Sequence, residues 1–163
     1  MAKMDPDAKK KALRMFTCGL YVVTAKHEAE VAAGTVTWLS QASFSPPLIM
    51  TAIRGDSHLH RVLEQSRSFA VSVVSESQKE MAEAFFRASQ IEDGKINGFA
   101  VETGQETGAP LVADAPAWVE ARVTESVSRG DHTVFVAEVV GAGVRDQNAR
   151  ALVLSDTPWT YGG

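Results

Sequence analysis

The sequence lacks the features that mark several large functional classes. Among its 163 residues Cys18 is the only cysteine, so no intrachain disulfide can form and a cysteine-based zinc site lacks ligands. The net charge is -4, and the only basic cluster is Lys9 to Lys11, so nothing resembles the electrostatic footprint of a nucleic-acid-binding protein. No apolar stretch is long enough for a signal peptide or a membrane span. These absences predict a cytoplasmic protein that binds neither nucleic acid nor membranes.

Common site motifs are also missing. The chain contains no G-x-G-x-x-G after a strand, no G-x-x-x-x-G-K-[ST], no H-E-x-x-H and no G-x-S-x-G. His58 and His60 lie two residues apart, which directs their side chains to different faces of a helix, so we expect no metal site. Two interpretations of this histidine pair stay open, solvated residues of a first helical turn or contacts to the phosphate or ribityl part of a ligand.

The pattern of apolar and turn residues predicts one mainly β domain with α additions over residues 1–163, whose hydrophobic content of 45% is ordinary for a globular protein. No regular alternation of strand and helix occurs, which favours an antiparallel barrel. We expect residues 87–117, rich in glycine and proline turn signals, to form a long, partly ordered connection. The expected helices are 6–15, 57–65 and one that ends at 86, and the expected strands are 20–25, 32–44, 48–53, 69–74, 118–127, 133–144 and 151–154.

The run from Gly34 to His60 carries the clearest functional signal. Gly34 allows close approach of a ligand, and an extended segment rich in short polar side chains follows it. Asp56 or Ser57 then caps a helix. Because the first amides of a helix lack intrahelical partners and the helix dipole favours negative charge there, this start can bind phosphate. The run therefore predicts a site for a phosphorylated, planar cofactor.

Three segments together resemble the flavin reductase-like family with an FMN-binding split barrel. They are Ser43-Phe44-Ser45-Pro46-Pro47-Leu48, Asp56-Ser57-His58 before a helix, and Gly130-Asp131-His132 at the start of a strand. Each segment alone is weak, but their order and spacing over most of the chain make the resemblance fairly specific. It implies a six-stranded antiparallel Greek-key split β-barrel, a homodimer, and one flavin per subunit near the interface.

The resemblance also implies roles for individual residues. Thr35, Val36, Thr37 and Trp38 would border the isoalloxazine; Ser40, Gln41 and Ala42 would contact its polar edge or the ribityl chain; Arg54 and Ser57 would bind the phosphate; His132 would be catalytic on the nicotinamide side. Relatives often carry a small polar residue at the position of Trp38, and a tryptophan there can stack on the flavin, crowd it, or belong to the core. Gly130 to His132 also suits an ordinary hairpin turn.

The implied activity is an FMN-binding oxidoreductase, an NAD(P)H-dependent flavin reductase that transfers hydride from nicotinamide to flavin. FAD is an alternative cofactor, and either NADH or NADPH can be the donor. A monooxygenase that receives reduced flavin is the implied partner. Two other functions stay open: a non-catalytic FMN-binding electron-transfer module, and a split barrel that binds haem or acts as an interaction subunit.

Overall fold

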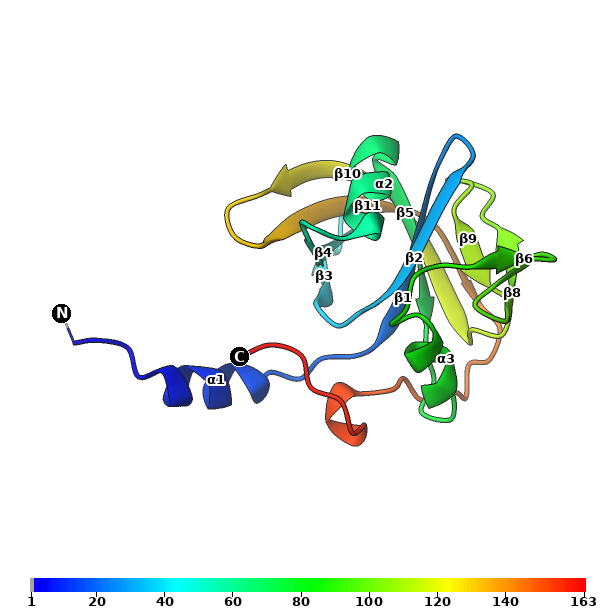
Figure 1. The fold of residues 1–163 in the computed structure, drawn as a ribbon. Coiled ribbons are helices and arrows are strands. Elements are labelled where there is room, and N and C mark those ends of the chain that lie inside the picture. Colours follow the sequence, from blue (N-terminus) through cyan, green and yellow to red (C-terminus); the bar gives the residue numbers. More distant parts are fainter. Residues whose placement is uncertain (1) are drawn as a thin grey trace.

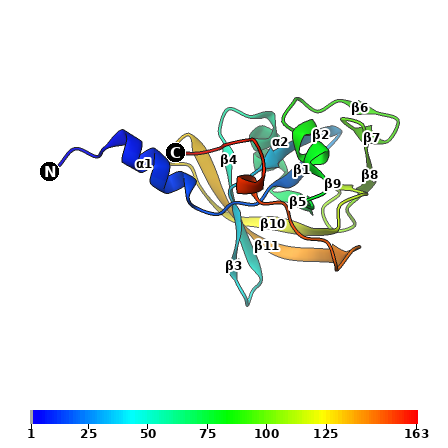
Figure 2. The same cartoon turned by 90° about the horizontal axis from the view of Figure 1, so that it is seen from below.

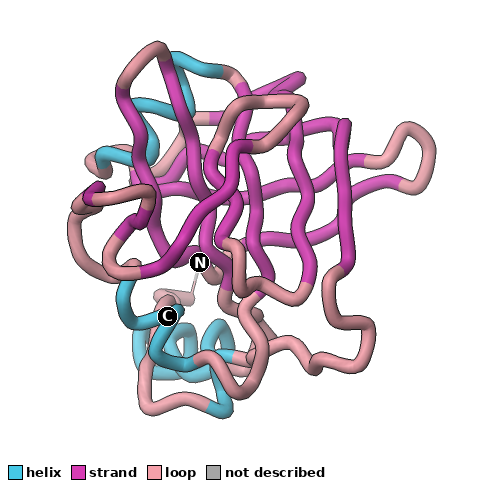
Figure 3. Tube along the Cα trace, turned by 90° about the vertical axis from the view of Figure 1, so that its right-hand side faces the viewer, coloured by secondary structure: helices cyan, strands magenta, loops and turns pink. Residues whose placement is uncertain are grey.

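A seven-stranded antiparallel sheet forms the body of the protein in the computed structural model, which describes residues 2–163 (Figure 1). Its strands are β1 (Tyr21–His27), β2 (Glu30–Val36), β3 (Leu39–Ser43), β4 (Leu48–Arg54), β5 (Ser68–Val73), β10 (Ala117–Val127) and β11 (His132–Val144), in the order β2-β1-β5-β10-β11-β4-β3. In Figure 3 the strands, drawn in magenta, cross one another around the interior, with the helices at the periphery. The prediction of a mainly antiparallel β fold with α additions is confirmed.

The sheet has seven strands, whereas the family resemblance implied a six-stranded split barrel. The difference arises because the single strand expected over residues 32–44 is divided into β2 and β3. β2 pairs with β1, while β3 pairs with β4, so the chain changes partner at Thr37 and Trp38. The Trp38 carbonyl accepts hydrogen bonds from the Ala52 amide (3.0 Å) and the Thr51 hydroxyl (2.9 Å), which ties the junction to β4.

The helical elements of the described chain are α1 (Pro6–Arg14), α2 (His58–Ser66), α3 (Lys79–Ala84) and the short 3-10 turn η1 (Leu154–Asp156). α1 begins where the Asp5 carboxylate accepts from the amides of Asp7 and Ala8, and it has no buried residue. Figures 1 and 2 show it at the side of the body, next to the C-terminal end of the chain. The predicted helix is therefore present, but its burial within this chain is slight.

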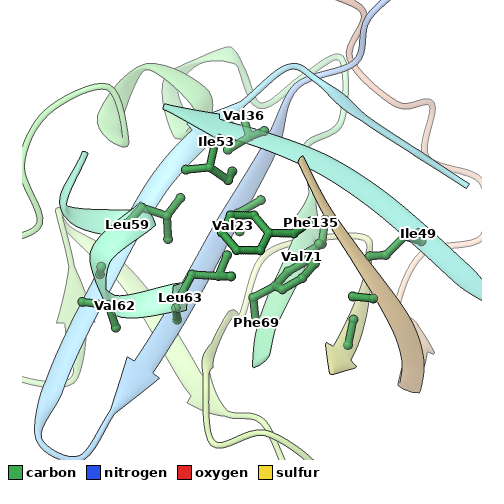
Figure 4. Packing of buried hydrophobic residues seen from close by; sticks show 14 residues of the cluster. Val23, Val36, Ile49, Ile53, Leu59, Val62, Leu63, Phe69, Val71 and Phe135 are labelled. Carbon is green, nitrogen blue, oxygen red and sulfur yellow. The ribbon is translucent and has the colours of Figure 1, made fainter. Parts of the chain in front are cut away.

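The main core lies between the sheet and α2. Leu59, Val62 and Leu63 repeat at the spacing of one helix face, so α2 presents three apolar side chains to the strands. The rings of Phe69 and Phe135 are fully buried opposite them, as Figure 4 shows. This packing holds the end of β4, the start of α2 and the end of β2 in fixed positions around one another.

The region expected to be a partly ordered connection is more regular than predicted. It contains a four-stranded antiparallel sheet of β6 (Ile91–Glu92), β7 (Lys95–Ile96), β8 (Phe99–Thr103) and β9 (Pro110–Val112). Its first two turns use positive φ at Asp93, Gly94, Asn97 and Gly98. Strands of two or three residues leave too little periodicity to recognise in a sequence, and here burial of Ile96 and Val112 in a second apolar cluster stabilises them.

The strand expected over residues 151–154 does not form. Ala151 makes an isolated bridge to Ser75, and Val153 makes another to Gly19. Because the two residues pair with different segments, no continuous ladder develops, and η1 follows at once. The chain then runs back along the body towards α1 (Figure 2), and we call residues 157–163 the C-terminal segment.

Candidate functional site

A cleft of about 690 Å³ opens where β2, the start of α2, the end of α3 and the C-terminal segment meet. The volume falls in the range of small-molecule sites. Its lining consists of residues 33–38, 52–54, 57–59, 85–89 and 159–161 together with Leu154. We call Gly34 to Trp38 the strand wall and Trp159 to Tyr161 the tail wall.

Six of the ten site residues predicted from the sequence line this cleft, namely Thr35, Val36, Thr37, Trp38, Arg54 and Ser57. They come from β2, the β2–β3 junction, β4 and the N-cap of α2, and only the pairing of β2 with β1 and of β3 with β4 brings them together. The strand wall and the helix start thus face one cavity, as a bound planar and phosphorylated group requires.

Ser40, Gln41 and Ala42 are not among the lining residues. They lie on β3, where all three are exposed. The Ser40 hydroxyl donates to the Gln41 carbonyl (3.0 Å), and the Gln41 side-chain amide donates to the Ser43 carbonyl (3.3 Å). Their polar groups therefore bond within the β3–β4 hairpin and do not reach the cleft of this chain.

The two threonines of the strand wall differ in their hydrogen bonding. The Thr35 hydroxyl donates to the Ala82 carbonyl at 2.6 Å, which ties β2 to α3. The Thr37 hydroxyl is buried and has no hydrogen-bond partner. A buried polar atom without a partner costs about 1–3 kcal/mol, and most such atoms in proteins are satisfied. Thr37 lines the cleft, so its hydroxyl is one polar group of the strand wall that could hold a cofactor.

The start of α2 supplies the features of an anion site. The Ser57 hydroxyl accepts from the His60 amide (3.1 Å) and donates to the Arg54 carbonyl (2.8 Å), so Ser57 caps the helix as predicted. The amides of His58 and Leu59, in the first turn, have no carbonyl of the helix to bond. Arg54 adds positive charge at the same place, although its guanidinium also bonds Asp56 at 3.0 Å. A phosphate group of a ligand fits this helix start.

The two histidines of α2 have separate environments. His58 Nε2 lies 2.8 Å from a carboxylate oxygen of Glu30, which also accepts from Arg61 at 2.5 Å. The hydrogen bond from His58 is the main cause that lowers the pKa of Glu30. His60 is buried, and its Nε2 lies 2.7 Å from the Thr133 hydroxyl. Within residues 2–163 no cluster of histidine, cysteine and carboxylate side chains could hold a metal ion.

His132 is not among the residues that line the cleft. Its Nδ1 is 2.7 Å from a carboxylate oxygen of Asp131, and its Nε2 is 2.7 Å from the hydroxyl of Tyr161. The Trp38 ring lies against both aromatic side chains, with its centroid 4.5 Å from that of His132 and 5.1 Å from that of Tyr161. His132 is thus adjacent to the site, because it contacts Trp38 and Tyr161, which both line the cleft.

The pKa values of the two partners of His132, Asp131 and Tyr161, are shifted in opposite directions. The hydrogen bond from His132 is the main cause that lowers the pKa of Asp131. Burial raises the pKa of Tyr161, the charge of Arg54 opposes this, and the charge of Asp131 adds to it. Arg54 of β4 and His132 of β11 are paired directly opposite each other in the sheet, so the helix start with Arg54 and the surroundings of His132 adjoin.

The sequence reasoning missed two parts of the lining, residues 85–89 and the tail wall. The aromatic residues Phe86 and Trp159 meet edge to face with centroids 4.8 Å apart, which joins the two parts. The available signal was the presence of Trp159 and Tyr161 in a short polar segment without strand or helix periodicity. Large aromatic side chains in such a segment usually pack against something distant, and here they pack over the cleft.

Comparison with known proteins gives a consistent result. Residues 13–160 match the family described as flavin reductase like domain. The NADH-dependent flavin reductase StyB of Pseudomonas fluorescens is 32% identical over 147 residues, which cover 90% of this chain and 83% of that protein.

Two solved structures extend the comparison. The Streptomyces globisporus NADH:FAD oxidoreductase SgcE6, in complex with NAD and FAD fragments, aligns with a TM-score of 0.78 at 28% identity, covering 94% of this chain and 92% of that one. The styrene monooxygenase flavin reductase of Pseudomonas putida S12 aligns with a TM-score of 0.74 at 27% identity, covering 92% and 93%. No described helix of the present chain is long and apolar enough to cross a membrane.

Proposed function

This chain belongs to the family of flavin reductase like domains, and we propose that it is an NAD(P)H-dependent flavin reductase whose cofactor occupies the cleft. The observation that carries the proposal is the buried, unpartnered hydroxyl of Thr37, a residue that lines the same cavity as the start of α2. The Thr37 hydroxyl suits the polar edge of a flavin, and the start of α2 suits its phosphate. A flavin supplies the redox chemistry when bound, because it accepts hydride from a nicotinamide.

FMN is the cofactor that the lining fits most directly. Thr35, Val36, Thr37 and Trp38 border the isoalloxazine, and Arg54 and Ser57 bind the phosphate. The Thr35 hydroxyl is already bonded to α3, so Thr37 contributes the free polar group of this wall. FAD contains the same flavin and first phosphate, and the Streptomyces globisporus relative is named for FAD, so FAD is the alternative.

The remaining site predictions have different support. His132 belongs to the donor side, because it adjoins the cleft through Trp38 and Tyr161. Ser40, Gln41 and Ala42 stay predictions that the geometry of one chain does not support, since their polar groups bond within the β3–β4 hairpin. The domain comprises residues 1–163, and β2 with β3 represents one strand of a six-stranded split barrel. Cytoplasmic residence also stays a prediction.

A homodimer explains the exposed apolar side chains of the chain. Met15, Phe16 and Phe44 are exposed by 82%, 69% and 92% respectively. Met15 and Phe16 follow α1, and Phe44 follows β3. Large apolar residues in such exposed positions often lie in protein interfaces. Sedimentation should give a dimer. A monomer that still retains one tightly bound FMN would exclude a flavin site shared between subunits.

Reduced flavin has a monooxygenase as its acceptor in this proposal. The support is the relative of Pseudomonas putida, which is named as the flavin reductase of a styrene monooxygenase. The acceptor of the present chain can be tested by adding a candidate monooxygenase to the reductase with NADH and measuring its product.

Anaerobic reduction tests the main proposal. The purified protein is first titrated with FMN, FAD and riboflavin, and the complexes are then mixed with NADH or NADPH in the absence of oxygen. We expect tight binding of a phosphorylated flavin and loss of its yellow absorption with one of the donors. A bound flavin that stays oxidised with both donors would instead identify an electron-transfer module, and failure to bind any flavin would exclude both functions.

A further inference from the structure

We propose that Tyr161 presents the polar contact to the nicotinamide donor, and that His132 is a positioning residue that acts through Tyr161. The inference rests on the proposed reductase function and names a residue of the tail wall that the sequence did not indicate. It follows from which hydrogen-bonding groups are already used and which side chain faces the cleft.

Both ring nitrogens of His132 are occupied. Nδ1 faces the Asp131 carboxylate and Nε2 faces the Tyr161 hydroxyl, each at 2.7 Å. A histidine has no third polar atom, so His132 cannot contact a ligand in this arrangement. Its side chain is also only 14% exposed, and it does not line the cleft.

The chain of hydrogen bonds fixes the polarity of the Tyr161 hydroxyl. The Asp131 carboxylate accepts only, so Nδ1 of a neutral His132 carries the proton and Nε2 accepts from Tyr161. The Tyr161 oxygen then has lone pairs left and no proton to donate. Such an oxygen is complementary to an N–H group, and the carboxamide of a nicotinamide carries one.

The position of Tyr161 suits a ligand that exchanges in every turnover. Tyr161 lines the cleft yet is 39% exposed, whereas Thr37 on the opposite wall is buried. The donor must enter and leave while the cofactor stays, so its contacts are expected at the open side. Burial raises the pKa of Tyr161, which keeps the hydroxyl protonated and the contact to His132 intact over the neutral pH range.

Two further contacts hold Tyr161 in place. Its ring meets Trp38 edge to face, and the carbonyl of the next residue, Gly162, accepts from Arg14 of α1 at 3.1 Å. Gly162 has a φ of 102°, and a Cβ there would come within 3.3 Å of the Trp38 ring, so glycine allows the segment to pass closely. The ring of Tyr161 is thus held independently of its hydroxyl, which makes a selective test possible.

The test compares Tyr161→Phe with Tyr21→Phe, which removes a hydroxyl on β1 outside the cleft. We expect Tyr161→Phe to raise the KM for the nicotinamide donor about three- to tenfold, as loss of one neutral hydrogen bond does. The FMN dissociation constant should stay within about twofold of wild type in both variants, and Tyr21→Phe should leave the KM unchanged. Thermal unfolding confirms that each variant is folded.

A double-mutant cycle tests the role of His132. His132→Ala should raise the donor KM as Tyr161→Phe does, and the double variant should be no worse than either single variant, because both changes remove one contact. His132→Gln, which keeps side-chain bulk, is measured in parallel to separate a packing effect. If the increases in donor KM of the two single variants multiply in the double variant, the positioning role is wrong, because His132 then affects the donor independently of Tyr161.

Other outcomes separate this inference from the proposed function. If wild type reduces flavin and Tyr161→Phe does so with an unchanged donor KM, Tyr161 is excluded while the reductase function stands. If Tyr161→Phe weakens FMN but not the donor, the contact is to the cofactor and the inference is wrong. If wild type reduces no flavin with either donor, the proposed function and this inference both fail.

Discussion

The two walls of the cleft are built in opposite ways. The strand wall continues β2, whose backbone pairs with β1 at every residue, and Val36 belongs to the buried core with Leu59. The tail wall has no ladder. It is held by the hydrogen bond between Tyr161 and His132, by aromatic contacts, by the bond from Arg14 to Gly162, and by packing of Trp159 at the edge of the second apolar cluster. A segment without a strand ladder and with few buried apolar contacts unfolds locally at a lower free-energy cost than a core strand. The comparison teaches that the rigid wall suits a retained cofactor and the tail wall suits an exchanging donor.

The largest expected difference between the walls is in stability. Phe135→Ala removes a fully buried ring from the core behind the strand wall and should lower the free energy of unfolding by about 3–5 kcal/mol. Tyr161→Ala removes a partly exposed ring of the tail wall and should cost about 1 kcal/mol or less. Urea unfolding of both variants measures this. Equal losses would show that the tail wall is part of the cooperative core.

The phosphate end of the cleft can be tested by comparing two flavins. Arg54→Ala and Ser57→Ala should each weaken FMN by about 1–3 kcal/mol more than riboflavin, because only FMN carries a phosphate. Ser57 also caps α2, so Ser57→Ala tests the helix start as a whole, whereas Arg54→Ala tests the positive charge beside it. Arg61→Ala, on α2 but outside the cleft lining, is the control. Equal weakening of FMN and riboflavin would exclude Arg54 and Ser57 as the phosphate site.

The two threonines of the strand wall should respond with opposite signs. Thr37→Val removes an unpartnered buried hydroxyl, so the protein without flavin should become more stable by about 1 kcal/mol while its flavin affinity falls. Thr35→Val breaks the bond to the Ala82 carbonyl and should lower stability by about 1 kcal/mol. Urea unfolding without flavin and flavin titration measure both effects. A loss of stability in Thr37→Val would mean that its hydroxyl is already satisfied within the protein.

The smallest expected effect is the pH dependence of the contact between Asp131 and His132. The pKa of Asp131 in the folded protein lies below its ordinary value of 3.8, so its stabilising contribution is present above that pH and is lost as the pH falls through the lower, folded-state pKa. Asp131 is exposed, and the effect is small for that reason. Asp131→Asn and His132→Ala should flatten the fall in stability at pH values below the ordinary pKa of Asp131 to the same degree. Curves identical to wild type would show that the pair does not contribute.

Local sequence signals predicted the long elements and part of the site. The apolar spacing of Leu59, Val62 and Leu63 marked α2, and Ser57 before them marked its N-cap, because both signals lie within a few residues of one another. The short polar residues that follow Gly34 are also close together in the sequence, and they indicated the strand wall. The short strands β6 to β9 were missed, since each is too brief to show a period and is stabilised by contacts distant in sequence.

The sequence by itself determined the elements whose signals are local: most of the long strands, the capped helix and the hairpin that carries His132. Only the tertiary structure decided what those elements face. It divided the predicted strand at Thr37 and Trp38 and left Ser40, Gln41 and Ala42 outside the cleft. It also brought Tyr161 to the cleft lining and into contact with His132. The physical reason is that His132 and Tyr161 are 29 positions apart in the sequence. Whether two such distant residues meet depends on the packing of the whole chain, which no local pattern encodes.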